Sequence, residues 1–330
     1  NGKILPKQNG RISPKNGRLE DEMITKDKIQ LMGTTIEMGV NHPEGLAILE
    51  VAKKKLIDYE ARFSANRPDS MLSKINQAAG KAFVSVDHDL FTLIAIGKKA
   101  SLVPHSAFNI AIGPLTKLWH IGFKDAKKPS DKEIQQVLPL INANHILLDE
   151  RHSAIYLKQQ GMSIDLGGIA KGYFADLIMQ DFKQQGVMSA YINLGGNVLV
   201  SGPNYEQEDF KWQIGLQNPF LERGNQVLTL KLTDYSVVTS GIYERVNTFE
   251  GQKYHHIFDS KTGYPLESEI ASLTILSKKS VDGEIYTSSL FSYSPIEAVK
   301  YIMQQTLHEI IVITKNGEMI YSPGIEDLLA

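Results

Sequence analysis

The alternation and spacing of apolar residues divide most of the chain into strands and helices. Residues 29–40, IQLMGTTIEMGV, alternate loosely and are rich in Thr and Ile, which predicts a strand at the start of the folded part. Residues 44–64 and residues 87–103 both carry apolar side chains at helical spacing, so each predicts a helix. Ser130 and Glu133 form a capping-box pattern, which predicts a further helix start.

The second half of the chain is richer in strand patterns. Residues 145–166 predict two strands, and the helix that follows is expected to stop at Gly186. A last helix near residues 294–305 precedes a hairpin that turns at Asn316-Gly317. Strands outnumber helices without strict strand–helix–strand alternation, which predicts an α+β fold with mixed or antiparallel sheets and packed helices. The remaining strand patterns occupy residues 189–202, 209–219, 226–241 and 269–277.

Composition narrows the class of protein. With 330 residues, 42% of them hydrophobic and 22% charged, the chain has the balance of a globular protein with a large core. No apolar run reaches the roughly 18 residues that a membrane span requires. The chain has no cysteine, which excludes disulfides, thiol catalysis and cysteine metal sites.

The first 22 residues differ from the rest. NGKILPK and NGRISPK form a short basic repeat, and no acidic residue occurs before Glu20. Asn-Gly and Pro recur every few residues and oppose a regular element, so we expect a flexible basic tether over residues 1–22. A folded region over residues 23–330 follows. Weak nucleic-acid binding by the tether is the alternative, but no aromatic residue lies among the basic ones.

The segment DLGGIAKGYFADLI, residues 165–178, is the first candidate site. Gly167 and Gly168 permit backbone conformations closed to other residues and let a ligand approach the main chain. The helix expected to start near Ile169 offers free N–H groups, and Lys171 in its first turn indicates an anion such as phosphate. A tight strand-to-helix turn with a solvated lysine is the alternative. The spacing matches neither a dinucleotide fingerprint nor a P-loop.

Other polar or glycine-containing stretches accompany this segment along the chain. In order they read MGTT (32–35), RPDSMLSKIN (67–76), FNIAIGPLTKLW (108–119), DLGGIAKGYFAD (165–176), NLGGNVLVSG (193–202), TSGIYER (239–245), HHIFDSKTGYP (255–265) and DGEIYTSSLF (282–291). Together they resemble the ApbE family of flavin transferases. The resemblance implies an ApbE-like, T-fold-like architecture of two intimately joined α/β halves. It also implies magnesium-dependent transfer of FMN from FAD to a threonine hydroxyl of a target protein, with release of AMP.

The resemblance implies FAD contacts at seven positions. Asn66 stands where many members have an aromatic residue, and Asn109 stands where they usually have Asp. His256 is the candidate catalytic residue, because a histidine titrates near neutral pH and can accept the proton of the threonine hydroxyl. The adjacent His255 is expected to point to the other face of its strand. The seven positions are Met32, Ser64, Ala65, Asn66, Asn109, Lys171 and His256.

The metal ligands that the resemblance implies are the backbone carbonyl of Gly168 and the side chains of Glu284 and Ser288. The two side chains are four residues apart, so a helical turn places both oxygens on one face. A carboxylate and a hydroxyl suit a hard cation such as Mg²⁺. Glu is one methylene longer than the Asp that is usual at this position. Alignment from Asp282 would instead make that residue the ligand.

Two other functions stay open at this point: a FAD pyrophosphatase that yields FMN and AMP, and a non-enzymatic FAD-binding protein. Many family members are exported, often as lipoproteins. The sequence begins at Asn1 without Met, and its basic spacer fits a trimmed lipoprotein. We therefore expect a protein tethered to the outer face of a bacterial cytoplasmic membrane by an N-terminal lipid. Its expected partners are FAD and a target protein, not nucleic acid.

Overall fold

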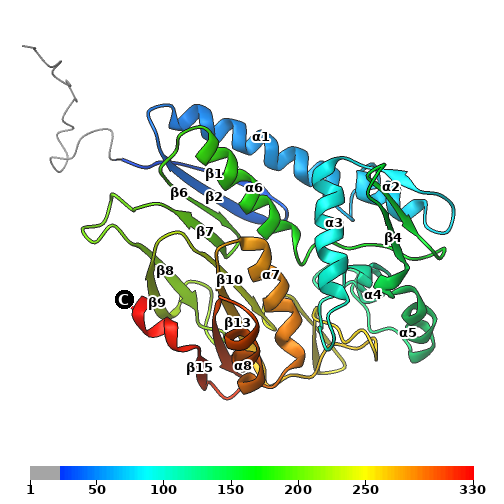
Figure 1. The fold of residues 1–330 in the computed structure, drawn as a ribbon. Coiled ribbons are helices and arrows are strands. Elements are labelled where there is room, and N and C mark those ends of the chain that lie inside the picture. The colour runs from blue at the N-terminus through cyan, green and yellow to red at the C-terminus, as the bar shows by residue number, and fades with distance from the viewer. Residues whose placement is uncertain (1–22) are drawn as a thin grey trace, which may run out of the picture.

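An eight-stranded sheet forms the centre of the computed structural model, which describes residues 23–330 (Figure 1). All neighbouring strands in this sheet are antiparallel, which confirms the predicted α+β class with antiparallel sheets. The expected tether at residues 1–22 lies outside the described residues. In spatial order the strands are β1 (Thr25–Leu31), β2 (Thr34–Asn41), β6 (Ser189–Leu194), β7 (Asn197–Ser201), β10 (Ser236–Gly241), β13 (Ile270–Ser277), β14 (Glu309–Thr314) and β15 (Met319–Tyr321).

Four helices cover one face of this sheet (Figure 1). Helices α1 (Gly45–Phe63) and α6 (Ala170–Gln184) pack on the β1 side, whereas α7 (Ser280–Ser289) and α8 (Pro295–Gln305) pack on β10, β13 and β14. The apolar stripe of α1 is buried as its spacing predicts. Gly186 has a φ of 82°, a left-handed conformation that ends α6 where the sequence indicates.

A two-stranded hairpin covers part of the opposite face. Its strands are β8 (Trp212–Gln217) and β9 (Gln226–Leu232), and they share a buried cluster with the central sheet. On β7, Leu199 belongs to the helix-side core and the next residue, Val200, belongs to the hairpin-side core. Because the sheet is covered on both faces, every residue of β13 is buried.

The chain between α1 and α6 builds a smaller unit beside the sheet (Figure 1). A capping box joins Ser130 and Glu133 at the start of α5, as the sequence predicts. No helix between residues 23 and 330 is long and apolar enough to cross a bilayer. The unit contains α2 (Met71–Gln77), β3 (Val84–Ser85), α3 (His88–Ser101), η2 (Ile110–Ile112), α4 (Gly113–Trp119), α5 (Asp131–Val137), η3 (Leu138–Leu140), η4 (Ala143–His145), β4 (Ile146–Asp149) and β5 (Ala154–Leu157).

The segment after β10 ties this unit to the sheet. Strands β11 (Val246–Phe249) and β12 (Gln252–His255) form a small hairpin, whose Tyr254 packs with Trp119 of α4. The Trp119 indole Nε1 donates a hydrogen bond of 2.9 Å to the carbonyl of Gly263. Two short 3₁₀ helices, η5 (Leu290–Ser292) and η6 (Pro323–Leu328), complete the C-terminal part.

One predicted element is wrong. The single strand expected over residues 29–40 is a hairpin, in which β1 and β2 meet at Met32-Gly33. Both turn residues have positive φ, 53° and 71°, as a two-residue hairpin turn of the primed type requires. The apolar pattern continues on both sides of the turn, so alternation alone did not reveal the reversal.

Candidate functional site

A cleft of about 1840 Å³ opens beside the sheet and is lined by residues from the hairpin at Met32 to α7. It contains every position that the family resemblance indicated from the sequence. His255 and Asp282 are not among its lining residues. The ten positions brought together are Met32, Ser64, Ala65, Asn66, Asn109, Gly168, Lys171, His256, Glu284 and Ser288.

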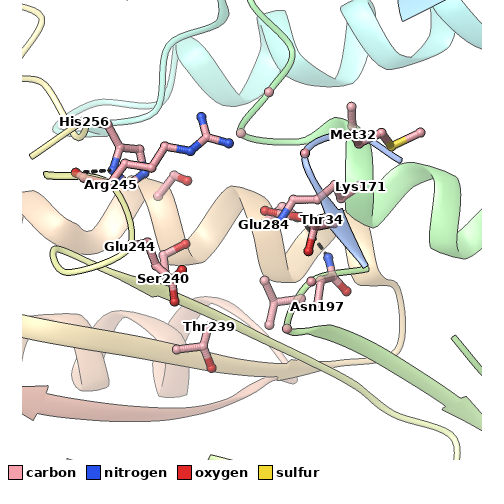
Figure 2. A pocket seen from close by; sticks show the side chains of 18 of the residues that line it. Met32, Thr34, Lys171, Asn197, Thr239, Ser240, Glu244, Arg245, His256 and Glu284 are labelled. Atoms are coloured by element: carbon pink, nitrogen blue, oxygen red, sulfur yellow. Dashed lines mark hydrogen bonds between the residues drawn. The ribbon is translucent and has the colours of Figure 1, made fainter. Parts of the chain in front are cut away.

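Five lining residues with polar or charged side chains are here called the charged wall: Lys171, Arg245, His256, Glu284 and Ser288. Figure 2 shows Arg245 beside His256 and Lys171 nearer Glu284. Lys171 lies in the first turn of α6, and Arg245 follows β10. Neither cation forms an ion pair with another described residue, so both are available to an anionic ligand. Arg245 was not singled out from the sequence, although it ends the stretch TSGIYER; an arginine closing a polar stretch was the available signal.

His256 presents a free ring nitrogen in this wall. Its Nδ1 lies 3.4 Å from the carbonyl oxygen of Arg245 (Figure 2). Because a carbonyl only accepts, Nδ1 carries the hydrogen and Nε2 of the neutral ring is left as an acceptor. Burial lowers the pKa of His256 to about 4, and the positive charges of Arg245 and Lys171 add to this shift. The ring is therefore neutral at neutral pH, with Nε2 as a hydrogen-bond acceptor.

The adjacent residue, His255, differs from His256 in how its ring nitrogens are used. Its Nε2 lies 3.1 Å from the carbonyl oxygen of Leu266, and its Nδ1 accepts from the backbone N–H of Ile257 at 3.3 Å. Both ring nitrogens are thus used inside the protein. Burial also lowers the pKa of His255, which keeps this ring neutral. The two histidines point to different faces, as their neighbouring positions on the chain predict.

Glu284 is a buried carboxylate, only 5% exposed. Its Oε1 accepts a hydrogen bond of 2.9 Å from Asn197 Nδ2 (Figure 2), and it forms no ion pair with a described residue. A buried carboxylate without a positive partner is unfavourable, so this position suits a cation. Asp282 lies elsewhere on α7, with its Oδ2 3.9 Å from His308 Nε2. The geometry thus favours Glu284 over Asp282.

Ser288 and Gly168 complete the predicted metal set. A Cβ placed on Gly168 would lie 3.9 Å from Ser288 Oγ, so the start of α6 and the end of α7 meet at the cleft. A carboxylate, a hydroxyl and a backbone carbonyl are ligands that suit Mg²⁺, which keeps several waters and binds substrate phosphate. Among residues 23–330 no three acidic or histidine side chains converge on one point. Glu284 would therefore be the charged side chain of the ligand set proposed for such an ion, together with Ser288 and the carbonyl of Gly168.

The Gly-Gly turn differs in one respect from expectation. Neither Gly167 nor Gly168 has a positive φ, so the turn does not use the left-handed conformation that glycine permits. Asp165 shapes the turn, since its Oδ1 accepts from Gly167 N at 2.8 Å and its Oδ2 accepts from Thr116 Oγ1 at 3.1 Å. Both glycines are exposed at the cleft, and Ile169 gives the start of α6 no side-chain cap. The glycines therefore matter because they leave the backbone accessible.

A second group of lining residues, here called the hairpin wall, consists of Met32 in the turn between β1 and β2 and Ser64, Ala65 and Asn66, which follow α1. Its hydrogen bonds hold its own backbone in place. Met32 N donates to Glu60 Oε1 at 2.7 Å, and Asn66 N donates to Ser64 Oγ at 3.2 Å. This wall thus offers a shaped surface and, in Asn66, one amide.

Asn109 lines the cleft, but its amide serves the fold. Its Nδ2 donates to the carbonyl of Ile141 at 2.8 Å and to Ser260 Oγ at 3.2 Å, and its Oδ1 accepts from Ala111 N at 2.9 Å. These bonds use both amide hydrogens. A contact between FAD and Asn109 therefore stays a prediction, restricted to the remaining acceptor capacity of Oδ1.

Comparison with known proteins agrees with this arrangement. The model of the ApbE family matches residues 32–312. The chain belongs to the ApbE family. A relative from Klebsiella pneumoniae strain 342, named FAD:protein FMN transferase, is 39% identical over 307 residues, which cover 92% of this chain and 93% of the relative. Another of the same name, from Treponema pallidum strain Nichols, is 34% identical over 256 residues, 74% of this chain and 71% of that protein.

Solved ApbE structures have the same fold. The ApbE protein of Thermotoga maritima superposes with a TM-score of 0.84 at 24% identity, covering 93% of this chain and all of that one. The apo form of the flavinyl transferase ApbE from Pseudomonas stutzeri gives a TM-score of 0.79 at 21% identity, covering 93% and 96%. The family membership and the fold expected from the sequence are both confirmed.

Proposed function

We propose that this ApbE-family protein is an FAD:protein FMN transferase, which moves FMN from FAD to a threonine hydroxyl of a target protein and releases AMP. The relatives that match nearly the whole chain bear the name of that activity. The observation that carries the proposal is the neutral His256, whose Nδ1 lies against the carbonyl of Arg245 in a cleft that also contains Lys171; neither cation is ion-paired with a described residue. A pyrophosphate requires such cations, and a hydroxyl nucleophile requires such a base.

The residues of the charged wall fit each part of the transfer. Lys171, Arg245 and the open turn at Gly168 bind and neutralise the pyrophosphate of FAD. The threonine oxygen attacks the phosphorus on the FMN side, and its proton passes to His256 Nε2. A new bond from threonine oxygen to phosphorus forms, the bond from that phosphorus to the bridging oxygen breaks, and AMP leaves with that oxygen.

Mg²⁺ belongs to the proposal as the ion that Glu284, Ser288 and the Gly168 carbonyl would hold. Bound there, it would neutralise charge on the phosphoryl oxygens. The buried, unpaired carboxylate of Glu284 supports this assignment. The open position of Ser288 along the same wall agrees with it.

Incubation of the purified protein with FAD, Mg²⁺ and host membranes lacking their own copy of it tests the proposal. We expect AMP in the supernatant, measured by chromatography, and a protein band with covalent flavin fluorescence in a denaturing gel. Mapping the flavin to a residue other than threonine would correct the acceptor. AMP with free FMN would show a FAD pyrophosphatase, and intact FAD would show a binding protein.

We also propose that the protein acts on the outer face of the bacterial cytoplasmic membrane, held by an N-terminal lipid. The basic, proline- and glycine-containing segment that precedes the folded part supports this as a spacer. Fractionation of cells that express the full-length gene, with protease treatment of spheroplasts, gives the test. Protection from protease, or recovery in the cytosol alone, would overturn the location.

A further inference from the structure

A chain of buried polar side chains leads from α6 to the carboxylate of Glu284. It begins at Asp176, whose Oδ1 accepts from Ser280 N at 2.7 Å and whose Oδ2 accepts from Val281 N at 3.0 Å. These are the first N–H groups of α7, and the N-cap residue Lys279 gives them no side-chain hydrogen bond. A carboxylate of one helix therefore caps the other.

The two helices touch where the cap is made. Gly172 lies one turn before Asp176, and a Cβ on it would come within 2.6 Å of the Ser280 carbonyl oxygen and 2.7 Å of Glu284 Cγ. No larger residue fits there without displacement of α7. The start of α7 is thus fixed against α6 both by packing and by the cap.

The chain continues through Ser280 and Asn197. Ser280 Oγ donates a hydrogen bond of 2.6 Å to Asn197 Oδ1, and Asn197 Nδ2 donates one of 2.9 Å to Glu284 Oε1. The serine determines which end of the amide faces the glutamate, because it occupies the amide oxygen. Ser280 is 0% exposed and Asn197 3%, so water does not compete for these bonds.

The hydrogen bond from the Asn197 side-chain amide occupies Oε1 of Glu284. Oε2 has no hydrogen-bond partner among the described residues. Glu284 also carries one more methylene than the Asp expected at its position, and so has one more torsion to fix. A hydrogen bond to a rigid strand is a direct way to fix it.

We infer that Asp176, Ser280 and Asn197 are positioning residues, which hold the Glu284 carboxylate in the orientation that binds the divalent cation. The inference rests on the proposed function, because it gives Glu284 the metal. Asp176 and Ser280 do not line the cleft, and Asn197 reaches it beside Glu284. Replacement of these residues changes the affinity for the cation and leaves the affinity for FAD at saturating cation unchanged.

The decisive variant is Asn197→Ala, studied in the full chain. We expect the Mg²⁺ concentration at half-maximal FAD cleavage to rise about tenfold or more. The second measurement needs no turnover: Mn²⁺ binding to the protein without FAD, followed by electron paramagnetic resonance, should weaken by a similar factor. Asn204→Ala is the matched control, since it also removes a buried asparagine but lies away from the cleft.

Ser280→Ala provides a milder test, because it removes only the hydroxyl that orients the amide. It should weaken Mn²⁺ binding less than Asn197→Ala, and the double variant should be little worse than Asn197→Ala alone. If either folded variant binds Mn²⁺ as the wild type does, the network is structural only and the inference is wrong. If the wild type binds Mn²⁺ through this network but transfers no FMN, the proposed function fails and the inference survives.

Discussion

The charged wall and the hairpin wall face the same cleft but are built differently. In the charged wall, Lys171, Arg245 and His256 Nε2 keep polar atoms free for a ligand. In the hairpin wall, the polar groups of Met32 and Ser64 are used to hold the backbone. The first wall is thus suited to charge and proton transfer, and the second to the shape of a flat or apolar group. Substitutions should therefore affect turnover on one side and affinity on the other.

Glu284→Gln should have the largest effect. Loss of the carboxylate that we propose binds the cation should lower FAD cleavage by about 100-fold or more, measured as AMP release. Asp282→Asn is the matched control on the same helix and should stay close to wild type, because Asp282 does not line the cleft. The reverse pattern would move the metal site to Asp282.

His256→Ala should lower turnover by about 10²- to 10⁴-fold, the usual contribution of a general base. Its melting temperature should change little, since Nε2 has no partner among residues 23–330. His255→Ala should instead lower the melting temperature and change turnover little, because it leaves the Leu266 carbonyl and the Ile257 N–H without partners. Equal losses of turnover in both variants would contradict the assignment.

The pKa of His256 makes a prediction about pH. The pKa of His256 is about 4 in the folded protein and ordinarily 6.5. As the pH falls, the ring is therefore protonated in the unfolded chain before it is protonated in the folded protein. The stability that the neutral ring contributes is complete above pH 6.5 and is lost as the pH falls toward 4. His256→Gln should reduce the fall in melting temperature over that range. Arg245→Met, which removes a nearby cation, should move the acid limb of the activity profile to higher pH; an unmoved limb would exclude His256 as the base.

Asn66→Tyr tests the hairpin wall. An aromatic ring there should stack on the flavin and tighten FAD binding by about twofold to tenfold, with little change in turnover at saturating FAD. Quenching of flavin fluorescence in a titration gives the affinity. Ser64→Ala controls for disturbance of the turn. A large loss of turnover in Asn66→Tyr would show that the two walls are not separable.

Deletion of residues 1–22 should have the smallest effect. Among the described residues, 23–330, those that line the cleft lie between Gln30 and Ser288. FAD cleavage by the shortened protein should therefore equal that of the full chain under the same conditions. A loss of about tenfold, or roughly 1.4 kcal/mol in the barrier, would show that the basic segment belongs to the site.

The sequence predicted the elements with strong periodicity and the residues of the site, but fewer of the hydrogen bonds that connect them. The stripe of α1 and the Gly186 stop followed from local chemistry. The turn at Met32 did not, because alternation continues on both sides of it. The role of Asn197 was not predicted from the sequence either. Its role depends on contacts with Ser280 and Glu284, more than 80 positions along the chain, and no local pattern encodes such contacts.

The order of strands in the central sheet has a consequence for synthesis. Strand β2, which follows the turn at Met32, pairs with β6, so that Ile36 faces Leu194. The carboxylate of the charged wall arrives only with α7, near the end of the chain. Such distant pairings are slow to close. The residues that line the cleft therefore come together only after the ribosome has synthesised the chain as far as Ser288, late in translation.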